Sequence, residues 1–257
     1  MPVSQEVQFV QDLPRPIAAT ATDYAPGDTT DWHSHPRAQL IYGISGVMTV
    51  NTEAGRWVLP PERAVWVPGG IEHRVDTVGG IRIRSLFVAP DAVRGMPPDC
   101  CVVTVSPLLK ALILEAVALP KLYDPQGPDG RLMAVILDQL KSLEPTPLYL
   151  PLPADPRLRR VTDGLAENPG DRTGLSAWAK KAGASGRTLA RLFVRETGLT
   201  FGAWRQQARL LKALEWLGEG RPVTGIALDL GYESPSAFTA MFRRAMGVPP
   251  GRYFKGR

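Results

Sequence analysis

The side chains best suited to holding a metal in this chain are its three histidines, at positions 33, 35 and 73. In an extended strand, His33 and His35 point to the same side because side chains alternate along it. His73 follows a Pro-Gly-Gly turn at positions 68–70, where a second strand can supply a third imidazole, and Gln39 can add its amide oxygen after a kink. Three imidazoles and a carbonyl oxygen suit a divalent transition metal, whether Zn, Ni, Fe, Cu or Mn.

The same histidines allow a second interpretation, in which they line an apolar pocket that binds an organic effector without a metal. Trp32, Tyr42 and Trp66 are candidates for lining such a pocket, although aromatic residues of a small barrel more often belong to its core. With a metal bound, the ion is either the signal itself or a fixed anchor that polarises an organic effector. The residues alone leave these alternatives open.

A second set of side chains, in the C-terminal half, is suited to binding nucleic acid. Residues 175–198 predict a short helix, a glycine-containing turn and a second helix capped by Ser185, which is the pattern of a helix-turn-helix. On the second helix Arg187, Arg191 and Arg195 are four residues apart and therefore aligned on one face. Arginine can bind guanine through two hydrogen bonds, worth about 1–3 kcal/mol of discrimination for each pair. The alternative is that these arginines form an ordinary solvated face.

The same pattern recurs about 48 residues further along the chain. Residues 223–230 predict another short helix, and Ser234 then caps a helix with Pro235 at its first position, where a missing N–H costs nothing. Arg243 and Arg244 point outward from this helix. Two such units in tandem favour a nucleic-acid-binding domain over a solvated surface.

The formal charge is divided unevenly between the two halves of the chain. Residues 1–150 carry 12 Lys and Arg against 16 Asp and Glu, a net charge of −4, whereas residues 151–257 carry 18 against 9, a net charge of +9. An acidic front and a basic back indicate that only the back half meets a polyanion.

The elements that must position these residues also differ between the halves. Short apolar runs broken by Gly, Pro and Asp predict the strands of an all-β sandwich or barrel at residues 38–44, 47–51, 56–59, 64–67 and 81–88. Two helices follow, at residues 107–119 and about 129–143, which either cover the barrel or supply a dimer seam. Five prolines in residues 144–156 predict an extended connector. Helical periodicity then continues to the C-terminus, with a long helix at about residues 201–217 between the two units.

Composition predicts a soluble globular protein, since 44% of the 257 residues are hydrophobic and 21% are charged. No run of about 18 uncharged apolar residues predicts a membrane span, and the first 16 residues lack the basic and apolar regions of a secretory signal. Cys100 and Cys101 are adjacent and cannot build a disulfide framework, so we expect a cytoplasmic protein. We interpret the pair as small buried hydrophobic residues.

The basic half resembles the AraC/XylS-type transcription regulators in one register over about a hundred residues. The matching positions are Ala179, Ser185, Arg187, Leu189, Arg191, Phe193, Gly198, Arg209, Ala213, Ile226, Ala227, Gly231, Tyr232, Ser236, Phe238, Phe242, Arg243, Gly247, Pro249 and Tyr253. The resemblance implies two helix-turn-helix units joined by a long helix, with recognition helices in major-groove segments about 34 Å apart. Val248 departs from the family, which usually has Ser or Thr there. The second recognition helix also carries short side chains where longer polar readers often sit, at Pro235, Ser236, Ala237 and Ala240.

We therefore expect the base sequence to be read mainly by the first unit, through Arg187 and Arg191. The second unit would mainly clamp phosphates, through Ser236, Thr239, Arg243 and Arg244. The full set of expected DNA contacts is Arg187, Thr188, Arg191, Arg195, Ser236, Thr239, Arg243 and Arg244.

The acidic half resembles the cupin fold, whose two motifs are G-x5-H-x-H-x3-E-x6-G and G-x5-P-x-G-x2-H. The positions in register are Gly27, His33, His35, Gly46, Pro68, Gly70 and His73. Gln39 stands where the first motif has glutamate, and Glu62 stands where the second opens with glycine. The resemblance implies a metal held by His33, His35, Gln39 and His73, with the neutral amide as a weaker ligand than a carboxylate.

These features predict an α+β chain of two domains: an N-terminal cupin-type β-barrel, or jelly roll, and an all-α C-terminal domain with two helix-turn-helix units. The predicted parts are a sensor barrel, a helical linker or dimerisation element, a proline-rich connector and a DNA-binding domain, at 1–95, 96–145, 146–156 and 157–257.

We expect a homodimeric transcription regulator, not an enzyme, that binds promoter DNA and responds to a metal or small-molecule effector in the barrel. RNA polymerase is a candidate further partner, and no membrane is expected. One alternative is a cupin metal-dependent oxygenase or isomerase with a DNA-binding tail. Another is a constitutive DNA-binding protein whose barrel binds nothing.

Overall fold

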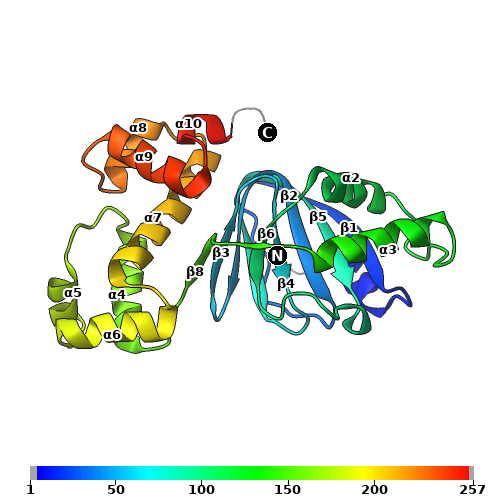
Figure 1. The fold of residues 1–257 in the computed structure, drawn as a ribbon, viewed down its shortest axis with the longest axis horizontal. Helices are drawn as coiled ribbons and strands as arrows, with labels where there is room; N and C mark the ends of the chain where they lie inside the picture. The colour runs from blue at the N-terminus through cyan, green and yellow to red at the C-terminus, as the bar shows by residue number, and fades with distance from the viewer. Residues whose placement is uncertain (1–4, 255–257) are drawn as a thin grey trace. The chain divides into compact units, whose positions relative to one another are not determined.

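The chain folds as two compact units in a computed structural model that describes residues 5–254 (Figure 1). The first unit comprises the residues through Glu53 together with Trp57–Leu148, and the second comprises Ala54–Arg56 and the chain from Tyr149 onward. Strands dominate the first unit and helices the second, which confirms the predicted α+β class. Among residues 5–254, no helix combines the length and apolar character that crossing a membrane requires.

The first unit is built on an antiparallel sheet whose strands lie in the order β1, β5, β2, β4, β6 and β7, with β3 paired to β2, whereas β8 belongs to the second unit. The strands are β1 (Ile17–Tyr24), β2 (Ala38–Thr52), β3 (Gly55–Leu59), β4 (Arg63–Val67), β5 (His73–Val88), β6 (Cys101–Thr104), β7 (Pro145–Thr146) and β8 (Tyr149–Pro151). The helical elements of this unit are α1 (Gln5–Phe9), η1 (Val10–Asp12), η2 (Pro90–Ala92), α2 (Pro107–Ala116) and α3 (Pro128–Lys141).

The long strand β2 bends, and this bend brings distant residues together. Its register with β5 aligns Gln39 with Phe87 at one end and Thr52 with His73 at the other, so a flat sheet would separate Gln39 from His73 by roughly 40 Å. The register shifts around Gly46, which has a φ of +79° and where a Cβ would lie only 2.7 Å from the carbonyl oxygen of residue 80. A glycine bulge of this kind curves a sheet, and the start of β2 and both ends of β5 then line one cavity.

Side chains that alternate along β2 enter two different cores. Leu40 and Tyr42 pack with α2 and α3 in one apolar cluster, whereas Gln39 and Ile41 line the interior cavity. Figure 1 shows α2 and α3 together beside the sheet. Because helices cover one face and the sheet curls around the other, both faces of the strand are buried.

Helices α2 and α3 confirm the two helices predicted after the strands, but they belong to the first unit. Their buried side chains share a cluster with the sheet, through Leu109, Ile113, Met133 and Ile136. The segment predicted as a linker, residues 96–145, therefore lies in the same unit as the barrel. The predicted connector is partly strand, since it contains β8 and the end of β7.

The second unit consists almost entirely of helices. They are α4 (Pro156–Glu167), α5 (Leu175–Lys181), α6 (Gly186–Thr197), α7 (Phe201–Gly218), α8 (Val223–Asp229), α9 (Pro235–Met246) and α10 (Pro250–Tyr253). As predicted, Ser185 caps α6 by accepting a hydrogen bond from the N–H of Thr188 at 3.1 Å, and Ser234 caps α9 through the N–H of Ala237 at 3.1 Å. The turn of each helix-turn-helix holds a glycine with positive φ, at Gly183 (+69°) and Gly231 (+74°).

Candidate metal centre and nucleic-acid interface

The structure brings the three histidines together at one end of the curved sheet. The ring centres of His33 and His73 are 4.3 Å apart, and His35 lies 5.1 Å from His73. One coordinating atom of each ring falls within 4.8 Å of the others. Main-chain bonds hold this arrangement, because His33 and His73 exchange N–H···O bonds of 3.0 and 2.8 Å, while Gly70 donates to the carbonyl of His35 at 2.9 Å.

The tautomer of each histidine is set by its own backbone surroundings. The Nδ1 atoms of His33, His35 and His73 lie 2.9, 2.6 and 2.9 Å from main-chain carbonyl oxygens two residues away. A carbonyl oxygen only accepts, so each Nδ1 carries the proton and each Nε2 keeps its lone pair. Metal-binding histidines are commonly oriented in this way.

Gln39 completes a donor set that a cation would satisfy. Its Nε2 donates to Ser85 Oγ at 3.0 Å, which turns Oε1 toward Nε2 of His35, also at 3.0 Å. Two lone pairs then face each other, and Nε2 of His73 is buried without a hydrogen-bond partner among the described residues. Buried polar atoms normally have partners, so these residues fit a metal ion.

Burial also keeps two of the imidazoles neutral. Desolvation lowers the pKa of His73 to about 3, and it lowers the pKa of His35 as well. Both rings are therefore unprotonated at neutral pH, which is the form that coordinates a metal.

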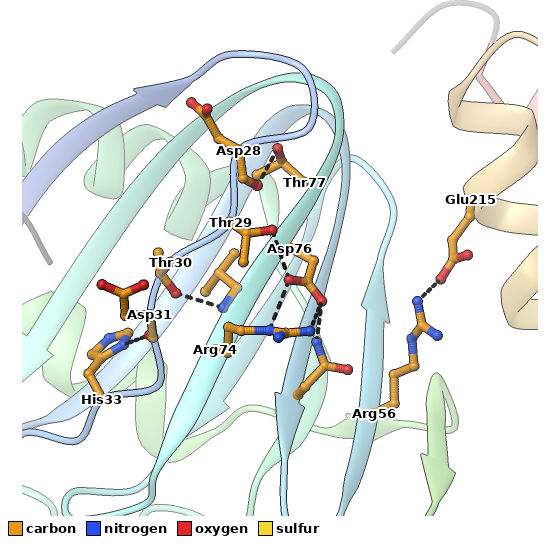
Figure 2. Close-up of polar contacts among 12 residues, drawn as sticks. Asp28, Thr29, Thr30, Asp31, His33, Arg56, Arg74, Asp76, Thr77 and Glu215 are labelled. Carbon is orange, nitrogen blue, oxygen red and sulfur yellow. Dashed lines mark hydrogen bonds and ion pairs between the residues drawn. The ribbon is translucent and has the colours of Figure 1, made fainter. Parts of the chain in front are cut away.

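A polar network that the sequence did not predict fixes the segment before His33 (Figure 2). The carboxylate of Asp76 accepts hydrogen bonds from Thr29 Oγ1 at 3.0 Å and Asn51 Nδ2 at 2.7 Å, and it forms an ion pair with Arg74 at 3.0 Å. The position of Asp76 in its strand did not indicate that its carboxylate would contact the loop before His33.

Figure 2 also shows an ion pair in the second unit, between Arg56 and Glu215 at 2.6 Å.

A hollow of about 290 Å³ is lined by His33 and His35 among others, whereas the cavity that His33, Gln39 and His73 help to line is small, at about 30 Å³, roughly the space of a single water molecule. The three aromatic residues predicted for an effector pocket do not line it. Tyr42 and Trp66 lie in the cluster with α2 and α3, and Trp32 is 46% exposed, 5.5 Å from the guanidinium of Arg74. The structure therefore separates Tyr42 and Trp66 from the histidine cluster.

On α6, the structure distinguishes the predicted DNA contacts from one another. Arg187 and Arg191 are exposed and have no ion pair or hydrogen bond with any described residue. Arg195 pairs with Glu196 at 2.9 Å, and Thr188 Oγ1 lies 2.9 Å from the capping hydroxyl of Ser185. Two arginines of the predicted four contacts are therefore free to meet a base edge.

On α9, the predicted contacts come together on a shallow concave surface. It is lined by Ser236, Thr239, Arg243 and Arg244, together with Pro235, Ala240, Gly247 and Pro249. Hydroxyl and guanidinium groups on such a surface suit phosphate oxygens.

Comparison with known proteins gives two family matches in this chain. Residues 178–256 match a helix-turn-helix domain and residues 21–88 match a cupin domain. The HTH-type transcriptional regulator NimR of Escherichia coli (strain K12) is 38% identical over 225 residues, which cover 88% of this chain and 82% of NimR. The regulatory protein SoxS of Salmonella typhimurium (strain LT2) is 42% identical over 97 residues, covering 37% of this chain and 91% of SoxS. The solved structure of ToxT from Vibrio cholerae covers 93% of this chain and 98% of its own, at 11% identity and a TM-score of 0.40.

Proposed function

Because the chain belongs to the AraC family of helix-turn-helix DNA-binding transcription regulators, we propose that it binds promoters through α6 and α9 under the control of a metal in its cupin domain. One observation carries the DNA-binding part of this proposal. Of the two capped recognition helices, α6 exposes arginines without an ion-pair partner among the described residues, and α9 presents a basic, hydroxyl-rich surface.

The two recognition helices divide the work unequally. Arg187 and Arg191, exposed on α6, have the reach and the paired donors to bind guanine edges. The α9 surface, with Ser236 and Arg243 among its lining residues, holds phosphates and adds affinity with little sequence information.

Selection from random duplexes by the full-length protein tests this division. The selected duplex is then changed one base pair at a time, and affinity is measured at fixed salt. Substitutions in the segment facing α6 are expected to cost about 1–3 kcal/mol each, and those facing α9 much less. Equal losses in both segments would contradict the division, and failure to retain any duplex in dilute salt would overturn DNA binding itself.

In the cupin domain, His33, His35 and His73 would hold a divalent transition metal through Nε2, and Gln39 through Oε1. Zn, Ni, Fe, Cu and Mn all suit this donor set. The metal, when bound, supplies a Lewis acid that can accept a further ligand. It acts either as the signal itself or as the anchor of a small effector.

Elemental analysis of the purified full-length protein tests the metal site. The wild type is expected to hold about one equivalent of metal per chain, and His73→Ala is expected to lose it. Thr22→Ala is the matched control, because Thr22 lines the same cavity without belonging to the donor set. Metal retained by His73→Ala would contradict the site.

For the metal to regulate DNA binding, it must bind two states of the protein with different affinities. The dissociation constant for the selected duplex is therefore measured with the metal and with a chelator. If adding or removing the metal changes neither DNA affinity, nor oligomeric state, nor transcription, the protein is a constitutive DNA-binding protein.

We include a homodimer in this proposal. Leu108 and Leu114 of α2 and Val135 of α3 are 53%, 40% and 44% exposed, and a second copy of the chain would cover them. Sedimentation velocity should show Leu108→Glu as a monomer, while Leu122→Glu, a control in the loop between the helices (59% exposed), stays dimeric.

We also propose that the protein acts in the cytoplasm as a regulator and has no enzymatic activity. The names of NimR and SoxS support this, since both are called regulators. Contact with RNA polymerase belongs to the same proposal.

A further inference from the structure

The two helix-turn-helix units touch each other at a point away from the long helix α7 that joins them. The loop before α5 meets the turn after α8, and the two backbones are in direct contact. A Cβ on Gly170 would lie 2.5 Å from the carbonyl oxygen of Asp229, and a Cβ on Gly231 would overlap the carbonyl oxygen of Gly170. Any side chain at either position would force the two units apart.

Arg209, which lies half-buried on α7, ties the two surfaces together. Its Nε donates to the carbonyl of Pro169 and its Nη2 to that of Asp171, both at 2.9 Å. The same guanidinium lies 5.6 Å from the ring centre of Tyr232, which belongs to the second helix-turn-helix. A planar fork can make this pair of bonds and stack at once, whereas an ammonium group cannot.

One further hydrogen bond joins the loop before α5 directly to the turn after α8: Arg172 Nε donates to the carbonyl of Gly231 at 3.0 Å. A single connecting helix fixes the distance between the two helix-turn-helix units, but each unit can still rotate where it joins the helix. A second point of contact removes that rotation.

We infer that Gly170, Gly231 and Arg209 form a bracket that fixes the angle between α6 and α9, so that the protein accepts only one spacing between the two DNA segments. This inference rests on the proposed entry of both helices into one duplex. Arg209 is therefore a positioning residue, because its guanidinium donates hydrogen bonds to carbonyl oxygens of the protein and not to DNA.

The bracket predicts a steep dependence on spacing. One inserted base pair moves the second segment by about 3.4 Å and turns it by roughly 35°. A rigid pair of readers then loses the contacts of one unit, and we expect the affinity of the wild type to fall at least about tenfold.

The test compares the selected duplex with duplexes that have one base pair inserted or removed between the segments, using the full-length protein. Gly170→Ala and Arg209→Lys are expected to reduce the penalty for changed spacing to less than about threefold. Arg209→Lys keeps the positive charge, so a change in electrostatic attraction cannot explain the result. Gly174→Ala is the matched control, because it lies in the same loop and its Cβ would meet nothing within 4 Å.

Each outcome decides the inference separately from the proposed function. A folded Gly170→Ala or Arg209→Lys that keeps the wild-type penalty overturns the bracket, as does a wild type that tolerates all spacings within about threefold. The second result needs no variant, so the inference stays testable if both substitutions unfold the protein. Equal weakening at every spacing would make Arg209 a direct DNA contact and would also overturn it. A wild type that selects no duplex would instead defeat the proposed function.

Discussion

In the proposed metal site, Gln39 would determine how strongly the histidine cluster holds a cation. Its Oε1 faces Nε2 of His35 because Ser85 accepts the hydrogen bond from the other side of the amide. A neutral oxygen at this position gives the metal no charge compensation, and the three histidines add none. We therefore expect this one residue to limit the metal affinity of the proposed site.

Replacement of Gln39 by Glu tests this limit. A carboxylate in the donor set is expected to tighten metal binding at pH 7 by about tenfold, equivalent to about 1.4 kcal/mol, in a titration against a competing chelator. Without metal, the buried charge should lower the melting temperature, and metal should restore it. Gln39→Glu with the metal affinity of the wild type would place Gln39 outside the coordination shell.

Glu62 is the described residue other than glycine with a positive φ, at +66°, and it stands where the cupin motif has glycine. Glu62→Gly is expected to raise the free energy of unfolding by up to about 1 kcal/mol, because the left-handed conformation costs a side chain about that much. The ion pair lost with Lys110, at 3.1 Å, joins two side chains that are each about 40% exposed and contributes little. Urea unfolding measures the change.

Lys110→Ala is the control for Glu62→Gly, since it removes the ion pair and leaves the backbone unchanged. It should alter stability by less than about 0.5 kcal/mol. A destabilised Glu62→Gly would show that contacts of the carboxylate outweigh the backbone strain.

At the scale of elements, the sequence predicted best what is determined locally. The caps at Ser185 and Ser234 and the turn glycines lie within a few residues of the helices that they start or end. Local hydrogen bonds fix them, so the second unit could be read helix by helix. The histidine cluster was predictable for a related reason, since His33 and His35 are only two residues apart, although they lie in the loop before β2 and not in the extended strand that we expected.

The features that the sequence did not predict depend on distant partners. Both faces of β2 are buried, so alternation could not show that Tyr42 faces the helices and Gln39 the cavity. Nothing in the order of residues indicated that Asp76 would meet Thr29, or that Arg209 would reach the carbonyl of Pro169. Such contacts follow from how the elements pack.

The start of α4 offers a test of capping. Asp155 accepts the N–H of Arg157 at 2.9 Å and pairs with its guanidinium at 2.7 Å, and these bonds lower its pKa to about 2. Asp155→Ala is expected to cost about 1 kcal/mol near neutral pH. A lowered folded-state pKa means that this contribution is present above pH 3.8 and is lost as the pH falls toward 2.

Tryptophan fluorescence during urea unfolding follows this difference between pH 7 and pH 3. Asp163→Ala is the control, an exposed aspartate on the same helix. A penalty for Asp155→Ala that stays constant down to pH 3 would mean that the cap does not act through its charge.

At the scale of the whole molecule, the distribution of charge matches the division of labour between the units. The first 150 residues carry a net charge of −4 and the rest +9. An acidic sensor repels the DNA that the basic half attracts, which favours binding through the recognition helices alone.

The dependence of DNA affinity on salt separates the two kinds of contact. Each phosphate contact that is removed should reduce the slope of log K against log salt by about 0.9. Replacing both Arg243 and Arg244 by Ala is expected to reduce it by about 1.8 while the preference among base sequences stays the same. Replacing Arg187 and Arg191 should relax that preference at the bases facing α6, because their guanidinium groups have no other partner in the described chain. If the α9 variant relaxed sequence preference as much as the α6 variant, both helices would read bases, and the short side chains of α9 would have to act through the shape of the groove.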